Sequence, residues 1–81
     1  MNLLSDNDWS ALSNALGRGE ALILTRTLGN LELTAETAEA PEAWSSEMLI
    51  GVEVRRNGRV LMRQWFDSAE RAKREVRRWK T

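Results

Sequence analysis

The side chains of this sequence that could carry out chemistry are carboxylates, guanidinium and amino groups, and hydroxyls, because it contains neither histidine nor cysteine. Without histidine, Ser/His/Asp and Cys/His nucleophilic sites are excluded, since they need an imidazole as general base. Without cysteine, disulfides, thiolate chemistry and the usual zinc sites are excluded as well. No carboxylate spacing indicates a magnesium site. We therefore expect no enzyme activity, no metal and no cofactor.

Two short patterns resemble ligand-binding motifs but have structural explanations. Gly17-Arg18-Gly19 is similar to part of a glycine-rich loop, yet it follows a predicted helix and no Gly-Lys-Ser/Thr is present. Asp6 and Asp8 form a carboxylate pair, which the start of a helix explains better than acid–base catalysis does.

The charges are distributed very unevenly along the chain. Residues 1–54 hold nine acidic and two basic residues, a net charge of −7, whereas residues 55–81 hold ten basic and three acidic residues, a net charge of +7. Such halves can attract each other within one fold, between two subunits, or toward a charged partner. The sequence does not choose among these three.

Aromatic and arginine side chains are the best candidates for binding a protein partner, because such residues dominate interface energies. The candidate partner-binding residues are Trp44, Arg55, Arg63, Trp65, Arg71, Arg74, Arg77 and Arg78. A candidate acidic surface comprises Glu36, Glu39, Glu42 and Glu47. A solvated loop around the acidic residues, and basic residues that complement the dipole of a C-terminal helix, are the structural alternatives.

The first half of the chain predicts a helix followed by a β-hairpin. Ser5 is the expected N-cap, and Gly17 and Gly19 end the helix. Residues 20–28 alternate as a half-buried strand that carries Leu28 on its apolar side, and a two-residue turn at Gly29-Asn30 leads into the second strand. This register places Leu28 opposite Leu31 and Leu24 opposite Ala35. We expect residues 37–46, which include the only proline, to form a loop.

The second half predicts another hairpin and a basic helix. Strands over 48–55 and 59–66 meet at Asn57-Gly58, where two registers are open. The hydrophobic pattern favours a three-residue loop with a bulge, which aligns Val60 with the core side. Trp65 then lies on the other side, which either a neighbouring element or a partner covers. Asp67 or Ser68 caps the helix that follows.

Together these elements predict an α+β fold of order αββββα, with a four-stranded antiparallel sheet and both helices packed on one of its faces. A chain of 81 residues is long enough for one core, so we expect a single domain over residues 1–81. No apolar run is long enough to span a membrane and no secretory signal is present, which favours the cytoplasm.

One resemblance covers residues 50–81. The residues that carry it are Val52, Glu53, Val54, Asn57, Gly58, Val60, Phe66, Asp67, Ser68 and Glu70. This strand, turn, strand and helix pattern resembles the same run in certain small phage anti-CRISPR proteins. The resemblance implies a compact, non-enzymatic inhibitor that binds a CRISPR effector complex and keeps it from target DNA. The run is also similar to the end of WGR-type nucleic-acid-associated domains, although the Trp-Gly-Arg signature is missing.

Small size, separated charge and four tryptophans favour an inhibitor or adaptor that binds a protein partner. The resemblance implies that this partner is an effector complex that handles nucleic acid. The first alternative is a small nucleic-acid-binding module that uses the basic C-terminal helix and hairpin. The second is a homodimer that joins the acidic and basic halves.

Overall fold

The computed structural model describes residues 2–39 and 48–79, and it confirms the predicted α+β architecture. The elements are α1 (Asp6–Arg18), β1 (Leu22–Leu28), β2 (Leu31–Glu39), β3 (Met48–Arg56), β4 (Arg59–Phe66) and α2 (Ala69–Arg78). The four strands form one antiparallel sheet in the order β1-β2-β3-β4, so β1 and β4 are its edges.

Helix α1 begins and ends as its sequence predicts. The backbone N–H of Asp8 donates to Ser5 Oγ over 3.1 Å, and the backbone N–H of Ser5 donates to Asp8 Oδ2 over 3.0 Å. This reciprocal capping box satisfies two backbone donors at the helix start. Gly19 ends the helix in the left-handed conformation at φ 67°, which costs glycine little because it has no Cβ.

The first hairpin has the predicted register, but its second strand is longer than predicted. Leu28 lies opposite Leu31, and Leu24 lies opposite Ala35. Residues 37–39 were expected in a loop, and instead they continue β2 to Glu39. Thr37 explains the difference, because its buried hydroxyl donates to the Glu20 carbonyl over 2.6 Å and accepts from the Leu22 N–H over 2.8 Å. The remainder of the predicted loop lies outside the described residues.

The second hairpin turns in two residues, so the expected three-residue loop is wrong. Asn57 and Gly58 both adopt positive φ, 52° and 80°, and Arg56 pairs directly with Arg59. An Asn-Gly pair tolerates two left-handed residues and closes the turn without a third. A bulge is present, but it lies within β4, where Val54 pairs with Met62 and Arg55 with Val60. Val60 is therefore 50% exposed and does not join the core side, although Met62 does.

Helix α2 settles the choice between the two candidate caps. Ser68 Oγ accepts from the backbone N–H of Arg71 over 3.2 Å, so Ser68 is the N-cap. Asp67 instead forms an ion pair with the Arg71 guanidinium at 3.2 Å. The buried residues of the helix are Ala69, Ala72 and Val76, whose spacing gives one narrow apolar stripe facing the sheet.

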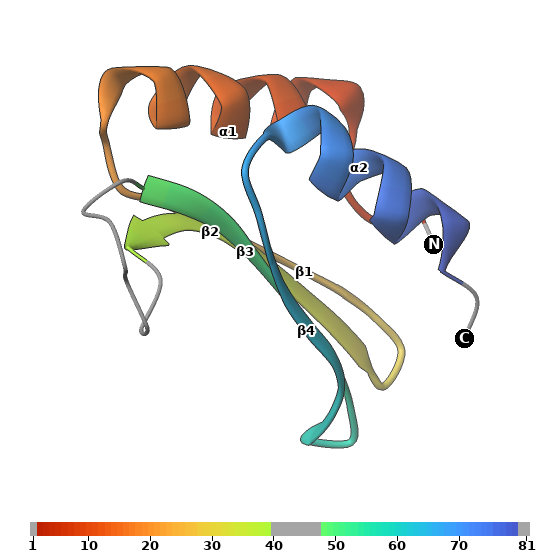
Figure 1. Ribbon diagram of the computed structural model, residues 1–81. Helices are drawn as coiled ribbons and strands as arrows, with labels where there is room; N and C mark the ends of the chain where they lie inside the picture. The colour runs from red at the N-terminus through yellow and green to blue at the C-terminus, as the bar shows by residue number, and fades with distance from the viewer. Residues whose placement is uncertain (1, 40–47, 80–81) are drawn as a thin grey trace.

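The molecule has two layers, with both helices on the same face of the sheet (Figure 1). The core lies between the layers. Its largest fully buried apolar side chains are Leu4, Leu12, Leu33, Ile50, Val52, Val54 and Val76. Leu28 was expected on the buried side, but it is 65% exposed, because the hairpin turns project beyond the helices (Figure 1). Neither described helix is long and apolar enough to cross a bilayer.

Candidate functional site

The face of the sheet opposite the helices has no described helix or strand over it, and we call it the open face. Because side chains alternate along each strand, this face receives every second residue. Cross-strand pairing arranges them in rows across the four strands, of which the two central ones are Ile23, Glu36, Gly51, Trp65 and Thr25, Thr34, Glu53, Arg63. A third row holds Thr27, Glu32, Arg55 and Val60.

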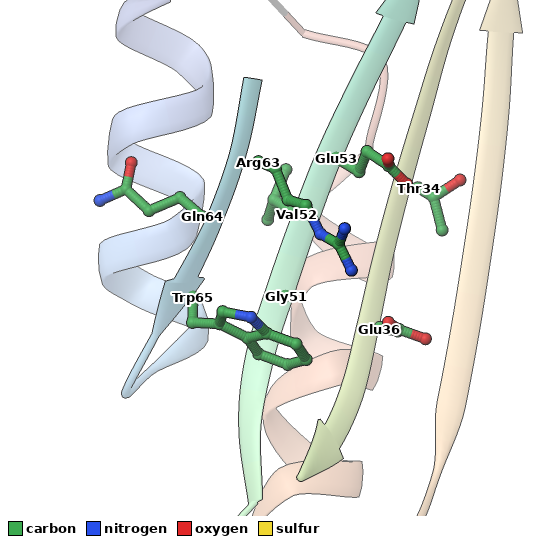
Figure 2. A pocket seen from close by; sticks show the side chains of 8 residues that line it. All are labelled: Thr34, Glu36, Gly51, Val52, Glu53, Arg63, Gln64 and Trp65. Carbon is green, nitrogen blue, oxygen red and sulfur yellow. The ribbon is translucent and has the colours of Figure 1, made fainter. Parts of the chain in front are cut away.

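Trp65 lies flat on the open face because its cross-strand neighbour is Gly51. Figure 2 shows the indole crossing over β3 at this glycine, with the six-membered ring pointing toward Glu36. A Cβ at position 51 would stand 2.8 Å from Cζ3 of the indole and 3.0 Å from Cη2. The glycine thus supplies the space that the ring fills. The result is a half-buried aromatic platform with one side toward solvent.

The charges around the platform alternate in sign. Glu53 forms an ion pair with Arg55 of the same strand, with 3.0 Å between the guanidinium nitrogen and the carboxylate oxygen. Arg63 lies opposite Glu53 and extends across β3, and it makes no ion pair within 4.0 Å with any residue that the structure describes (Figure 2). Glu36 likewise has no ion pair among the described residues. The open face therefore offers an exposed guanidinium and a half-buried carboxylate near Trp65.

The hollow beside Trp65 is too small for a metabolite. It has a volume of about 30 Å³ and is lined by Thr34, Glu36, Gly51, Val52, Glu53, Arg63, Gln64 and Trp65. This is room for a water molecule or two, whereas sites for drug-sized ligands enclose hundreds of Å³.

A wider hollow lies at the ends of the two hairpins. It has a volume of about 400 Å³ between the turns of the hairpins, and the Asn57 N–H ties these turns together by donating to the Asn30 carbonyl over 3.1 Å. It is lined by the turn residues Gly29, Asn30, Asn57 and Gly58 and by Thr27, Leu31, Glu32 and Arg55. This lining holds no aromatic ring, so we take the part of the open face around Trp65 as the better candidate site.

The basic helix α2 lies on the other side of the sheet, where part of its charge is neutralised within the fold. Asp6 of α1 pairs with Arg77 at 2.6 Å and with Lys73 at 3.4 Å. Hydrogen bonds from these two side chains hold the pKa of Asp6 below its ordinary value of 3.8, the bond from Arg77 first. Hydrogen bonding to the Ser5 N–H lowers the pKa of Asp8, which also pairs with Arg26 at 3.0 Å.

The predicted site residues therefore fall into separate groups. The open face brings together Arg55, Arg63, Trp65 and Glu36, while Glu39 is exposed at the end of β2. The helix residues Arg71, Arg74, Arg77 and Arg78 lie on the opposite side of the sheet, so they do not form one surface with Trp65. In α2, Arg71 pairs with Asp67 and Arg78 with Glu75, both at 3.2 Å. Trp44, Glu42 and Glu47 lie outside the described residues.

Sequence reasoning missed Gly51 as a member of the site. The signal was present, because a glycine inside a strand pattern often marks a close approach by another group. What the sequence lacked was the register that places this glycine beside Trp65. It also missed Asp6 as the partner of the basic helix, since residues 6 and 77 are neighbours only in the folded chain.

The described residues contain no cluster of three or more acidic side chains placed to hold a metal ion. In comparisons with protein-family models, curated proteins and solved structures, no match to this chain was found.

Proposed function

We propose that this chain is a small, non-enzymatic inhibitor that binds a protein partner through the open face. The observation that carries the proposal is the Trp65 ring held flat on Gly51 beside Arg63, on a sheet face that no described element covers. Tryptophan and arginine are the residues most enriched among interface hot spots.

The platform is suited to binding because it is already in place. Trp65 is held against the backbone of β3, so little side-chain freedom remains to be lost when a partner packs on its outer side. Arg63 adds a guanidinium, which can bind a carboxylate through two parallel N–H···O hydrogen bonds. An anchor that is ordered beforehand raises affinity by lowering the entropy cost of association.

The charge pattern supports a protein partner rather than a phosphate backbone. Arg55 and Arg63 share the open face with Glu32, Glu36 and Glu53, so a polyanion lying across it would meet three carboxylates. Alternating charges instead match the mixed surface of a protein, on which they orient the encounter.

The most specific form of the proposal comes from the resemblance of residues 50–81, under which the partner is a CRISPR effector complex. The test is a mobility-shift assay in which a purified effector complex binds target DNA in the presence of increasing amounts of this protein. We expect the protein to abolish the DNA complex at a stoichiometric ratio. If no effector type is inhibited, the anti-CRISPR assignment is wrong.

A variant pair tests the open face itself. Trp65→Ala and Arg63→Glu should each weaken partner binding, by about tenfold or more, as expected for hot-spot residues. Arg74→Glu is the matched control, because Arg74 is exposed on the opposite side and has no ion pair among the described residues. If Trp65→Ala and Arg63→Glu leave partner binding intact and Arg74→Glu abolishes it, the interface lies on α2.

The alternative of direct nucleic-acid binding is favoured by one observation, the exposed arginines of α2. Arg71, Arg74 and Arg78 lie on the solvent side of this helix, and Arg74 lacks an ion pair within the described part of the chain. A nucleic-acid module should shift duplex or single-stranded probes with an affinity that falls steeply as salt rises. Under our proposal the protein leaves both probes unshifted.

A further inference from the structure

The two edges of the sheet differ in how well they are protected against pairing with another strand. Edge strand β4 carries the exposed residues Arg59 and Arg63 and a bulge after Val60, all of which discourage strand addition. Edge strand β1, Leu22-Ile-Leu-Thr-Arg-Thr-Leu28, has no proline, no glycine, no bulge and one charged residue. Its side chains Ile23 and Leu28 are 62% and 65% exposed. By these criteria β1 is the less protected edge, although the Arg26 guanidinium covers the Thr25 carbonyl on it.

The hydrogen-bonding groups on the free side of β1 follow from its pairing with β2. In a hairpin with a two-residue turn, the pair that flanks the turn exchanges hydrogen bonds, and bonded pairs then recur at every second position. Leu28, Arg26, Leu24 and Leu22 therefore bond toward β2, and the backbone groups of Ile23, Thr25 and Thr27 point outward. The Arg26 guanidinium confirms this direction at Thr25, because it folds around the edge and donates to the Thr25 carbonyl over 2.9 Å.

We infer that β1 is a self-association edge, on which a second copy of this chain adds its own β1 in antiparallel orientation to form a continuous eight-stranded sheet. The pairing is centred on Thr25, which faces Thr25 of the second copy. Ile23 then lies opposite Thr27, and Leu22 lies opposite the exposed Leu28.

This register is self-complementary in charge as well as in shape. The single charged residue of the strand, Arg26, lies opposite Leu24. Its guanidinium, which lies at the Thr25 carbonyl near the symmetry axis, is paired with Asp8 over 3.0 Å, and this ion pair offsets its charge. Arg26 remains compatible with the pairing, because the Thr25 carbonyl has a second lone pair. The symmetry axis stands perpendicular to the sheet, and both pairs of helices therefore lie on the same side of the extended sheet. A β4 edge would instead bring arginines together.

Sedimentation velocity at protein concentrations from about 1 μM to about 1 mM tests this inference. A dimer with a dissociation constant far above about 1 mM would not form appreciably in this range. The wild-type protein should shift reversibly from monomer to dimer. Thr25→Pro removes the central N–H on both copies and should weaken the dimer by about tenfold or more. Thr25→Val is the matched control, because it removes the same hydroxyl and keeps the N–H, and its dimer should equal that of the wild type.

A second pair of variants keeps the test valid if Thr25→Pro fails to fold. Ile23→Lys places a charge on the exposed edge without touching the core and should also weaken the dimer. Leu61→Lys makes the same change at a residue 42% exposed near the opposite edge and should leave the dimer intact.

Amide hydrogen exchange locates the contact within one sample. Protection of the Ile23, Thr25 and Thr27 amides should rise with protein concentration, while that of Arg63 and Trp65 on the β4 edge stays constant.

Raising the salt from about 0.05 M to about 0.5 M should change the dimer little, since backbone pairing carries it. A monomer at every concentration overturns the inference. So does a dimer that survives both edge variants and dissociates with salt, which would be a dimer of the charged halves.

Discussion

The six-membered ring of Trp65 lies over Gly51 so closely that no Cβ fits between the ring and the backbone of β3. The distance from an ideal Cβ at position 51 to Cζ3 would be 2.8 Å, shorter than a carbon–carbon van der Waals contact. Each residue therefore explains the other: the glycine leaves a gap in the row of side chains across the sheet, and the indole occupies it.

Gly51→Ala should destabilise the protein by displacing the indole, and the same change should be harmless once the indole is gone. In a Trp65→Ala background, alanine at position 51 no longer meets a ring, and its higher strand propensity helps. We expect a coupling free energy of about 1–2 kcal/mol in the double-mutant cycle, measured by urea denaturation. Additive effects of the two changes would show that the ring does not rest on this glycine. Gly51→Ala should also weaken partner binding, as Trp65→Ala does.

Thr37→Val should destabilise the protein although its volume is conserved. The Thr37 hydroxyl joins the Glu20 carbonyl to the Leu22 N–H, at 2.6 Å and 2.8 Å. Valine leaves both backbone groups without this partner, at a cost of about 1–3 kcal/mol in the free energy of unfolding. Thr34→Val on the open face, which loses a 3.2 Å contact with Thr25 in an exposed position, is the control and should change stability by under about 0.5 kcal/mol.

The pH dependence of stability should reflect Asp6. Its pKa in the folded protein is lowered below 3.8 by hydrogen bonds from Arg77 and Lys73, so the folded state binds its proton less readily than the unfolded state. The stabilisation is therefore fully present above pH 3.8 and is lost as the pH falls through the lowered pKa. Asp6→Asn should flatten the decline in denaturation midpoint below pH 4, as measured by urea titrations.

Glu39→Gln controls for the loss of one carboxylate in that experiment. Glu39 is exposed and makes no ion pair with a residue that the structure describes. An acid profile that changes as much in Glu39→Gln as in Asp6→Asn would contradict a specific role for the contact between α1 and α2.

Asn57→Ala should destabilise the second hairpin, because position 57 requires a left-handed backbone at φ 52°. This conformation costs an alanine about 1 kcal/mol, whereas asparagine and glycine adopt it more readily. Asn57→Gly should match the wild type in thermal denaturation. An equal loss for both variants would indicate that the asparagine side chain, rather than the backbone angle, is what matters at the turn.

Some of the candidate site was within reach of the sequence and some was not. Alternation along β4 was enough to place Trp65 and Arg63 on the same side, away from the core. The separation of these two residues from Arg74 and Arg77 does not follow from the charge pattern, because the basic residues of the hairpin and of the helix are close together in the chain. Once α2 packs on the inner side of the sheet, the sheet itself stands between the two groups.

The amino-acid composition alone excludes histidine and cysteine chemistry. The order of elements, the helix cap at Ser5 and the register of the first hairpin follow from local signals, namely capping residues, turn residues and hydrophobic periodicity, which act between residues close in the chain. The folded structure was needed to place the bulge of β4, to show that Gly51 supports Trp65, and to show that Asp6 pairs with both Arg77 and Lys73. Those relationships join residues that are distant in the chain. They arise only when strands pair and helices pack, which local patterns do not encode.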